Sequence, residues 1–219
     1  MKTKLLLLLL LLSLLLCSCG DSLPQWKLEG EAYIDKKNDT VWYGAPLNFQ
    51  PVSTGAAAAM LGDTEICVIP DMDSSRWLAE AFEGIGAVYY AEGVTLPTLE
   101  TFEANGVLIC SEVNLTFVMA QSQDKALVDQ LVDAIVNGEA VEAAKGNSYH
   151  VKFTSAAYPG LYYDLLYIEG EDGCYYLFDR GIGKAVEIGR MLASLMPTDE
   201  EVASELAKDS GAAETEADA

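Results

Sequence analysis

The sequence predicts an α+β fold: a single compact domain with a largely antiparallel sheet, flanking helices, and a C-terminal β-hairpin followed by a helix. Strand-like and helical patterns are mixed along the 219 residues, without the strict alternation of βαβ units. The clearest hairpin signal comes late in the chain, and a helical pattern follows it. A division into two subdomains near Gln121 stays open, although no Pro- or Ser-rich linker marks it.

The first part of the expected domain contains short strands. Loose apolar alternation around the turn-like segment 36–39 predicts a hairpin within residues 27–43. Residues 46–62 are ambiguous, because Ala56–Ala59 fits either a helical turn or a loose connection. Thr64–Ile69 is expected to form a buried strand.

A helix is expected next, over Ser75–Glu83, because Asp73 or Ser74 can cap it. The inward face of this helix would carry Trp77, Leu78 and Phe82. Further along we expect a strand at Ala87–Ala91, a short helix or turn at Leu96–Glu103, and two strand-like pieces within residues 106–118.

The cleanest helix of the sequence is Asp124–Asn137. Leu127, Leu131 and Ile135 recur at helical spacing on one side, and Gly138 supplies the stop.

The C-terminal part is expected to begin with a strand at Tyr149–Thr154. The hairpin follows, with Leu161–Glu169 and Cys174–Asp179 joined by a Gly-Glu-Asp-Gly turn. Lys184–Met196 is predicted to form a final helix that Pro197 ends.

The first nineteen residues have the organisation of a secretory signal. Lys2 and Lys4 form a cationic start, and an apolar run over residues 5–16 follows, broken only by Ser13. This run is about half of the ~20 residues that a membrane-spanning helix needs. Its end, Leu16-Cys17-Ser18-Cys19, resembles a bacterial lipobox, whose last cysteine takes the lipid. The resemblance implies that acyl chains on Cys19 hold the protein on the extracytoplasmic face of the cell membrane.

This interpretation divides the chain into four parts. They are a lipoprotein signal peptide (1–18), a lipid-anchored tether (19–26), a globular α+β domain (27–197) and an acidic, mostly disordered tail (198–219). The mature part resembles an uncharacterised extracytoplasmic lipoprotein and no family of known function.

The formal net charge of −21 restricts the partners of the protein. Phosphate backbones repel such a surface, so we expect no nucleic acid partner. Anionic lipid headgroups repel it as well, so acyl chains rather than basic residues must hold it at the membrane.

Three cysteines remain outside the leader, namely Cys67, Cys110 and Cys174. Their odd number and wide spacing disfavour a disulfide framework or a zinc site. Their apolar surroundings indicate small buried side chains, and a Cys67–Cys110 bridge stays open for an oxidising compartment.

Several short motifs approach known chemistry without completing it. Ser122–Lys125 spells the S-x-x-K of serine β-lactamases and penicillin-binding proteins, but the S-D-N and K-T-G elements are missing. Asp71–Asp73 resembles the D-x-D of haloacid-dehalogenase phosphatases and the start of a calcium loop, but a capped turn explains it better. Gly181–Lys184 and Gly84–Gly86 fall short of a phosphate loop and a dinucleotide fingerprint. We expect no catalytic, cofactor-binding or metal-binding residue among these motifs.

His150 is the only histidine of the chain, so any histidine-based catalysis would have to use it. A pairing of this histidine with a cysteine cannot be inferred from sequence distance. We expect it to lie on a strand with a structural role.

Six tyrosines crowd the C-terminal hairpin region. An exposed row of them could stack on sugars or hold a protein partner. Apolar residues on both faces of the hairpin favour burial in a sheet instead. The six are Tyr158, Tyr162, Tyr163, Tyr167, Tyr175 and Tyr176.

The sequence is therefore interpreted as a membrane-anchored extracytoplasmic lipoprotein with a non-catalytic binding or accessory domain. Its partner would be a cell-surface protein or a glycan. The alternative is an envelope hydrolase with two acidic residues facing each other across a pocket. The binding component of a transporter is disfavoured, because such proteins usually need two larger α/β lobes.

Overall fold

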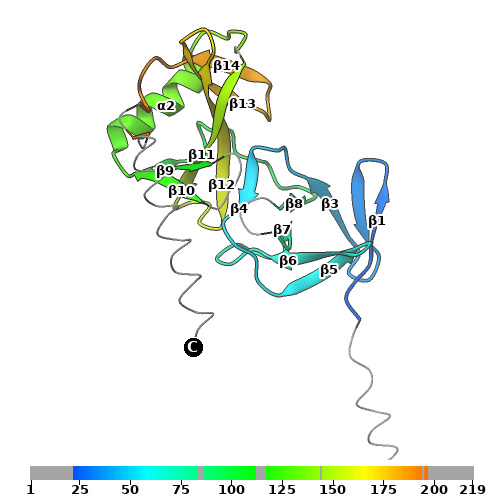
Figure 1. Ribbon diagram of the computed structural model, residues 1–219. Helices are drawn as coiled ribbons and strands as arrows, with labels where there is room; N and C mark the ends of the chain where they lie inside the picture. Colours follow the sequence, from blue (N-terminus) through cyan, green and yellow to red (C-terminus); the bar gives the residue numbers. More distant parts are fainter. Residues whose placement is uncertain (1–21, 83–85, 112–116, 144, 194, 197–219) are drawn as a thin grey trace, which may run out of the picture.

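The computed structural model describes residues 22–82, 86–111, 117–143, 145–193 and 195–196. Two antiparallel β-sheets make up most of these residues, and one helix, α2 (Lys125–Asn137), packs on the second sheet (Figure 1). The predicted α+β class with flanking helices is therefore wrong, because the described residues form a mostly β fold with α2 as their single α-helix. No helix within these ranges is long and apolar enough to cross a membrane.

The first sheet nearly closes into a barrel. Its strands lie in the order β1-β2-β3-β8-β7-β6-β5, and a parallel bridge between Gln25 and Met60 joins the two ends. The strands are β1 Trp26–Glu29, β2 Ala32–Asp35, β3 Thr40–Gly44, β5 Ala57–Leu61, β6 Thr64–Val68, β7 Trp77–Glu80 and β8 Val88–Ala91.

Aromatic rings fill the inside of this near-barrel. Trp26 stacks on Trp42 with ring centroids 5.3 Å apart and meets the edge of Tyr89 at 5.4 Å. Strand alternation sends neighbouring residues to opposite faces, so Leu78 joins this inner cluster while Trp77 joins the main core outside it. The first sheet therefore contributes to two apolar cores.

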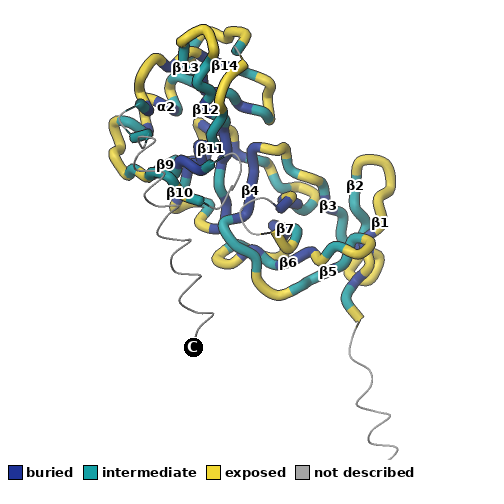
Figure 2. Tube along the Cα trace, in the orientation of Figure 1, coloured by how far each residue is buried: buried dark blue, intermediate teal, exposed yellow. Residues whose placement is uncertain are grey.

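The second sheet has the order β10-β9-β11-β12-β13-β14, and β4 pairs with β12 beside this path. The strands are β4 Phe49–Pro51, β9 Ala104–Ser111, β10 Val118–Ser122, β11 Gly146–Ser155, β12 Leu161–Gly170, β13 Tyr175–Asp179 and β14 Lys184–Glu187. β4 is buried along its length and lies at the junction of the two sheets (Figure 1; Figure 2).

The two faces of the second sheet differ in chemistry. Val151 lies opposite Ile109 and Leu165, on the face that packs with α2 into the main core. One residue along β11, His150 and Lys152 point to the other face, where Lys152 lies opposite Asp164. The polar residues of the sheet interior are thereby gathered on one side.

Strand β12 serves two partners along one edge. β4 pairs with its first residues, Leu161–Tyr163, and β13 pairs with Leu166–Glu169. Asp164 lies between them, and its backbone N–H donates to the carbonyl of Asn48 at 2.7 Å. This arrangement places an acidic side chain at the point where β4 and β13 approach each other.

Two predicted helices are strands or turns. Ser75–Glu83 contains β7, in which Trp77, Leu78 and Ala79 are all buried because the strand lies between two cores. Residues 184–196 contain β14, followed by turns up to the last described residues. In both segments, neighbouring apolar residues that are buried in strands gave a sequence pattern similar to the wide apolar face of a helix.

Other predicted elements are confirmed. The helix expected over Asp124–Asn137 is α2, and the Asp124 carboxylate caps it by accepting the N–H of Ala126 at 2.9 Å. The expected strand at Tyr149–Thr154 is the centre of β11, and the expected hairpin is β12 and β13. The ambiguous Ala56–Ala59 segment belongs mainly to β5.

Candidate functional site

Residues of the motifs that nearly fit known chemistry make local hydrogen bonds and ion pairs. Ser122 Oγ accepts the N–H of Asp124 at 3.1 Å, while Lys125 pairs with Asp129 at 2.7 Å on α2. The Asp73 carboxylate accepts the backbone N–H and the hydroxyl of Ser75 in a turn. Lys184 Nζ donates to the carbonyl of Ile135 at 2.7 Å.

The predicted lipidation site, Cys19, lies outside the described residues.

The three described cysteines are free thiols. Cys67 is buried in the first sheet and Cys110 in the second, so the disulfide that the sequence left open is not formed. Cys174 is half-buried at the hairpin turn.

The hairpin tyrosines form no exposed row. Tyr163, Tyr167 and Tyr176 are buried, and the other three are half-buried. Tyr167 stacks on Tyr175 with parallel rings at 6.0 Å. These side chains act as core and edge packing of the second sheet.

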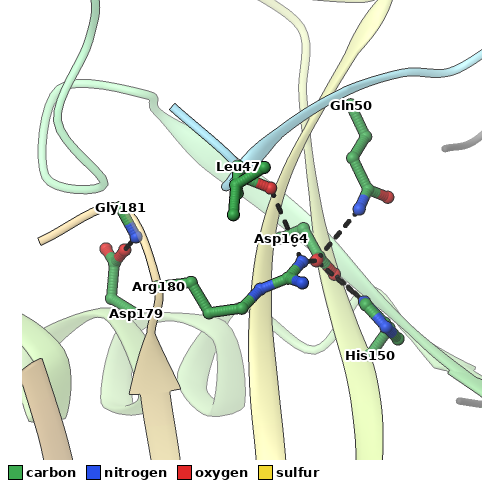
Figure 3. A network of polar contacts seen from close by, with 7 residues as sticks. All are labelled: Leu47, Gln50, His150, Asp164, Asp179, Arg180 and Gly181. Carbon is green, nitrogen blue, oxygen red and sulfur yellow. Dashed lines mark hydrogen bonds and ion pairs between the residues drawn. The ribbon is translucent and has the colours of Figure 1, made fainter. Parts of the chain in front are cut away.

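A buried polar network lies on the face of the second sheet that carries His150 and Lys152, and Figure 3 shows its residues. Its centre is Asp164, which has no exposed surface. His150 Nδ1 lies 2.8 and 2.9 Å from the two carboxylate oxygens of Asp164. Gln50 Nε2 donates to Oδ2 of the same carboxylate at 3.1 Å, and Arg180 Nη2 donates to it at 2.5 Å. Four segments distant in sequence therefore meet at one carboxylate.

Local structure on β4 and β13 positions the outer members of this network. Arg180 follows the last residue of β13, where the buried Asp179 carboxylate holds the turn by accepting the N–H groups of Gly181 and Ile182. Arg180 Nη2 also reaches the carbonyl of Leu47 at 3.5 Å, just before β4. The guanidinium thus bridges the gap between β4 and β13.

Two further titratable groups lie on the same face. Burial lowers the pKa of Lys152, whose Nζ lies 5.3 Å from the centroid of the Tyr162 ring. Burial raises the pKa of the Cys110 thiol, and the Asp164 carboxylate adds to this rise while Lys152 opposes it. Cys110 lies directly opposite His150 across β9 and β11.

A cavity of about 340 Å³ opens beside the network. Its lining combines both sheets, with Glu80 and Val88 from the first and His150 from the second. Residues near β4 complete the apolar part of the wall, together with the polar Gln50 and Arg180. We call this cavity the His150 pocket.

Two buried polar atoms of side chains in the His150 pocket lack a partner. Among the described residues, Gln50 Oε1 and Arg180 Nε make no hydrogen bond. One is an acceptor and the other a donor, and both side chains bond the same oxygen of Asp164. Most buried polar groups in proteins are paired, so these two atoms leave part of the hydrogen-bonding capacity of the network unused.

A second, more acidic cavity of about 410 Å³ lies between residues 99–104 and α2. Its carboxylates are Glu100, Glu103, Asp129 and Asp133. Asp129 is paired with Lys125, and Asp133 accepts from Asn137 at 2.7 Å on the exposed helix surface. The described residues contain no group of three or more His, Cys, Asp or Glu side chains that could hold a metal ion.

Sequence reasoning placed His150 on a strand with a structural role, and it missed Asp164, Arg180, Gln50 and Lys152 as the polar residues near it. A signal was present, because Asp164 is a charged residue within a hairpin that was expected to be buried. No family model, curated protein or solved structure matches this chain.

Proposed function

We propose that the protein is a non-catalytic binding lipoprotein, anchored through Cys19 on the extracytoplasmic face of a membrane, whose ligand enters the His150 pocket. The observation that carries this proposal is the His150 pocket itself, where Gln50, His150 and Arg180, all hydrogen-bonded to Asp164, lie beside apolar wall residues.

The form of the pocket supports ligand binding. Its volume of about 340 Å³ falls in the range of small-molecule sites, which combine apolar walls with a few oriented polar groups. Leu47, Phe49 and Val88 supply the apolar walls. The three hydrogen-bonded partners of Asp164 fix the orientation of the polar groups before a ligand arrives.

The state of the nearby reactive groups favours binding over catalysis. The raised pKa of the buried Cys110 keeps its thiol protonated at neutral pH, which disfavours nucleophilic attack. The Asp164 carboxylate is engaged by an arginine, a histidine and a glutamine. The carboxylates of the acidic cavity, where the alternative hydrolase would work, include two that are paired on an exposed helix face.

A ligand screen by thermal shift tests the binding site. The polar small molecules of the screen should include at least one that stabilises the protein, and Gln50→Leu should abolish that stabilisation. Gln121→Leu, the same change at an exposed position of β10, is the matched control and should keep it. Equal ligand-induced shifts in both variants would place the ligand elsewhere.

Intact mass of the membrane-extracted protein tests the anchor. We expect a diacyl or triacyl adduct at Cys19, lost together with membrane retention in Cys19→Ala. Cys17→Ala should keep both, since Ser18 and Cys19 are unchanged. An unlipidated mature chain would refute the anchor.

A further inference from the structure

We infer that the β2–β3 turn, residues 36–39, is the part of the domain that contacts the phospholipid headgroups of the membrane, and that the His150 pocket lies at the opposite end of the first sheet, in the aqueous phase. This inference rests on the proposed anchor at Cys19 and names the surface that the anchored domain turns toward the bilayer. It follows from the length of chain between the anchor and the domain, the contacts of that chain and the direction of β3.

The lipid-bearing residue is close to the described domain along the chain. Ser22, the first described residue, is three positions after Cys19. A chain extends by at most about 3.6 Å per residue, so the Cα atoms of these two residues are at most about 11 Å apart. The polar layer of one leaflet is itself roughly 5–8 Å thick, so the surface around Ser22 lies at the headgroups when Cys19 carries acyl chains.

The chain after Ser22 is fixed to the first sheet and is not a flexible linker. The carbonyl of Pro24 accepts the N–H of Met60 at 2.8 Å, and Gln25 forms a parallel bridge with the same residue of β5. Trp26 then begins β1. The point at which the chain leaves the domain toward Cys19 therefore has a fixed place on the near-barrel, without the free rotation that a long linker allows.

The β2–β3 turn lies at this exit point. Lys37 Nζ donates to the carbonyl of Ser22 at 2.9 Å. The buried Asp35 holds the shape of the turn, since its carboxylate accepts the N–H groups of Lys37 and Asn38 at 3.0 and 3.1 Å. A preformed turn is thus attached directly to the residue from which the chain continues to the anchor.

Lys36 gives this turn a group that suits phospholipid headgroups. Its side chain is 66% exposed, and its partner at 3.2 Å, Glu29, is exposed as well. Such exposed ion pairs contribute little, so the ammonium group can donate to a headgroup phosphate instead. The net charge of −21 does not prevent this contact, because charges farther away than about 8 Å are largely screened at physiological ionic strength.

The direction of β3 places the His150 pocket at the other end of the first sheet. β3 begins at Thr40, directly after the β2–β3 turn, and ends at Gly44, and the next residues, 45–47, line the pocket. The N–H of Ala45 donates to the carbonyl of Val88 at 2.8 Å, so the pocket residues of β8 lie at this same end. The five residues of β3, at about 3.3 Å each, separate the two ends by roughly 16 Å.

Figure 1 shows the same separation. β1 lies on the side of the first sheet away from the second sheet, whereas β4, whose residues Phe49 and Gln50 line the pocket, lies at the junction of the sheets. A domain that contacts the bilayer at the β2–β3 turn thus holds the pocket away from the membrane. Its ligand comes from solution and not from the lipid.

Quenching by labelled headgroups measures which end of the sheet lies at the membrane. The lipid-bearing protein is placed in phosphatidylcholine–phosphatidylglycerol vesicles, with and without a phospholipid whose headgroup carries a nitroxide. A thiol-reactive fluorophore is attached at Lys36→Cys in the turn or at Leu47→Cys at the pocket, both exposed positions. Both variants also carry Cys174→Ser, because Cys174 is half-buried whereas the other two described thiols, Cys67 and Cys110, are buried.

The nitroxide should remove a fraction of the Lys36→Cys emission that is at least about threefold larger than the fraction lost at Leu47→Cys, because the length of β3 separates the two positions. Equal quenching of the two labels, or stronger quenching at Leu47→Cys, would overturn the inference and leave the anchor intact. Absence of quenching at both positions would overturn it as well, since no part of the first sheet would then touch the headgroups. An unlipidated Cys19, seen by intact mass, would overturn the anchor and this inference together.

Discussion

At the scale of single residues, the stability of the second sheet depends on Asp164. Its carboxylate is fully buried and compensates the charge of Arg180, which is itself three-quarters covered. Removing one partner of a buried ion pair leaves an uncompensated charge, which costs more than the pair contributes.

We therefore expect Asp164→Asn to lower the free energy of unfolding by about 3–5 kcal/mol, measured by urea denaturation at pH 7. Asp133→Asn, on the exposed face of α2, should change it by less than about 0.5 kcal/mol. Equal stability of the two variants would show that the network contributes nothing to folding.

Lys152 should make stability depend on pH in the alkaline range. Burial lowers its pKa from the ordinary 10.5, with Cys110 and Asp164 opposing this shift and Arg180 adding to it. Below the lowered pKa, the folded and unfolded chains both hold the proton. Between the lowered pKa and 10.5 only the unfolded chain holds it, so the contribution of Lys152 to stability rises with pH.

Urea denaturation of the wild type and Lys152→Met at a series of pH values measures this contribution. The difference in unfolding free energy between the two should be flat below the lowered pKa and should shift in favour of the wild type as pH rises from there to 10.5. Lys125→Met, at an exposed position of α2, should show no such slope. A slope of opposite sign would mean that the folded state raises the pKa of Lys152.

The residues of the site could be predicted only in part. His150 stood out because it is the only histidine of the chain. Its partners come from β4, β12 and the end of β13, and the distance between these segments in the sequence carries no information on their contact. The pairing of β4 with β12, which a local pattern cannot reveal, brings Gln50 to Asp164.

At the scale of elements, local patterns predicted α2 and the β12–β13 hairpin, and they mistook two strands for helices, β7 at the junction of the sheets and β14 at the end of the second sheet. The β12–β13 hairpin and α2 carry strong turn and periodicity signals, and both are present. β7 carries apolar residues on both faces because two cores enclose it, so its pattern lacks the alternation of a half-exposed strand.

The β11–β12 turn lies against the segment that follows β6 of the first sheet. A side chain at Gly160 would place its Cβ 2.5 Å from Ile69 Cγ2 and 2.6 Å from the carbonyl oxygen of Pro70. We expect Gly160→Ala to destabilise the protein by about 1–3 kcal/mol, as seen by thermal or urea unfolding. Gly44→Ala is the control, since its Cβ would meet only Tyr33 at 3.9 Å. Equal stability of the two variants would show that the turn accommodates the added methyl group without a loss of unfolding free energy.

At the scale of the whole molecule, the two sheets share one main core. Val88 and Trp77 of the first sheet pack in the same cluster as Val151 and Leu165 of the second. A shared core couples the unfolding of its parts.

We expect one unfolding transition. The three tryptophans, Trp26, Trp42 and Trp77, all lie in the first sheet. Tryptophan fluorescence therefore follows the first sheet, and far-UV circular dichroism follows both. Coincident urea transitions by the two probes are expected, whereas separated midpoints would show that the sheets unfold independently.

The pairing of β4 with β12 has a consequence for the order in which the protein can assemble during synthesis. All strands of the first sheet lie within residues 26–91, so they leave the ribosome before every strand of the second sheet except β4. β4 leaves with them, yet its partner residues Leu161–Tyr163 emerge more than a hundred residues later. The nascent chain thus carries β4 with unpaired backbone hydrogen-bonding groups until residues 161–163 of β12 have been synthesised. The His150 pocket is completed later still, when Arg180 has been added.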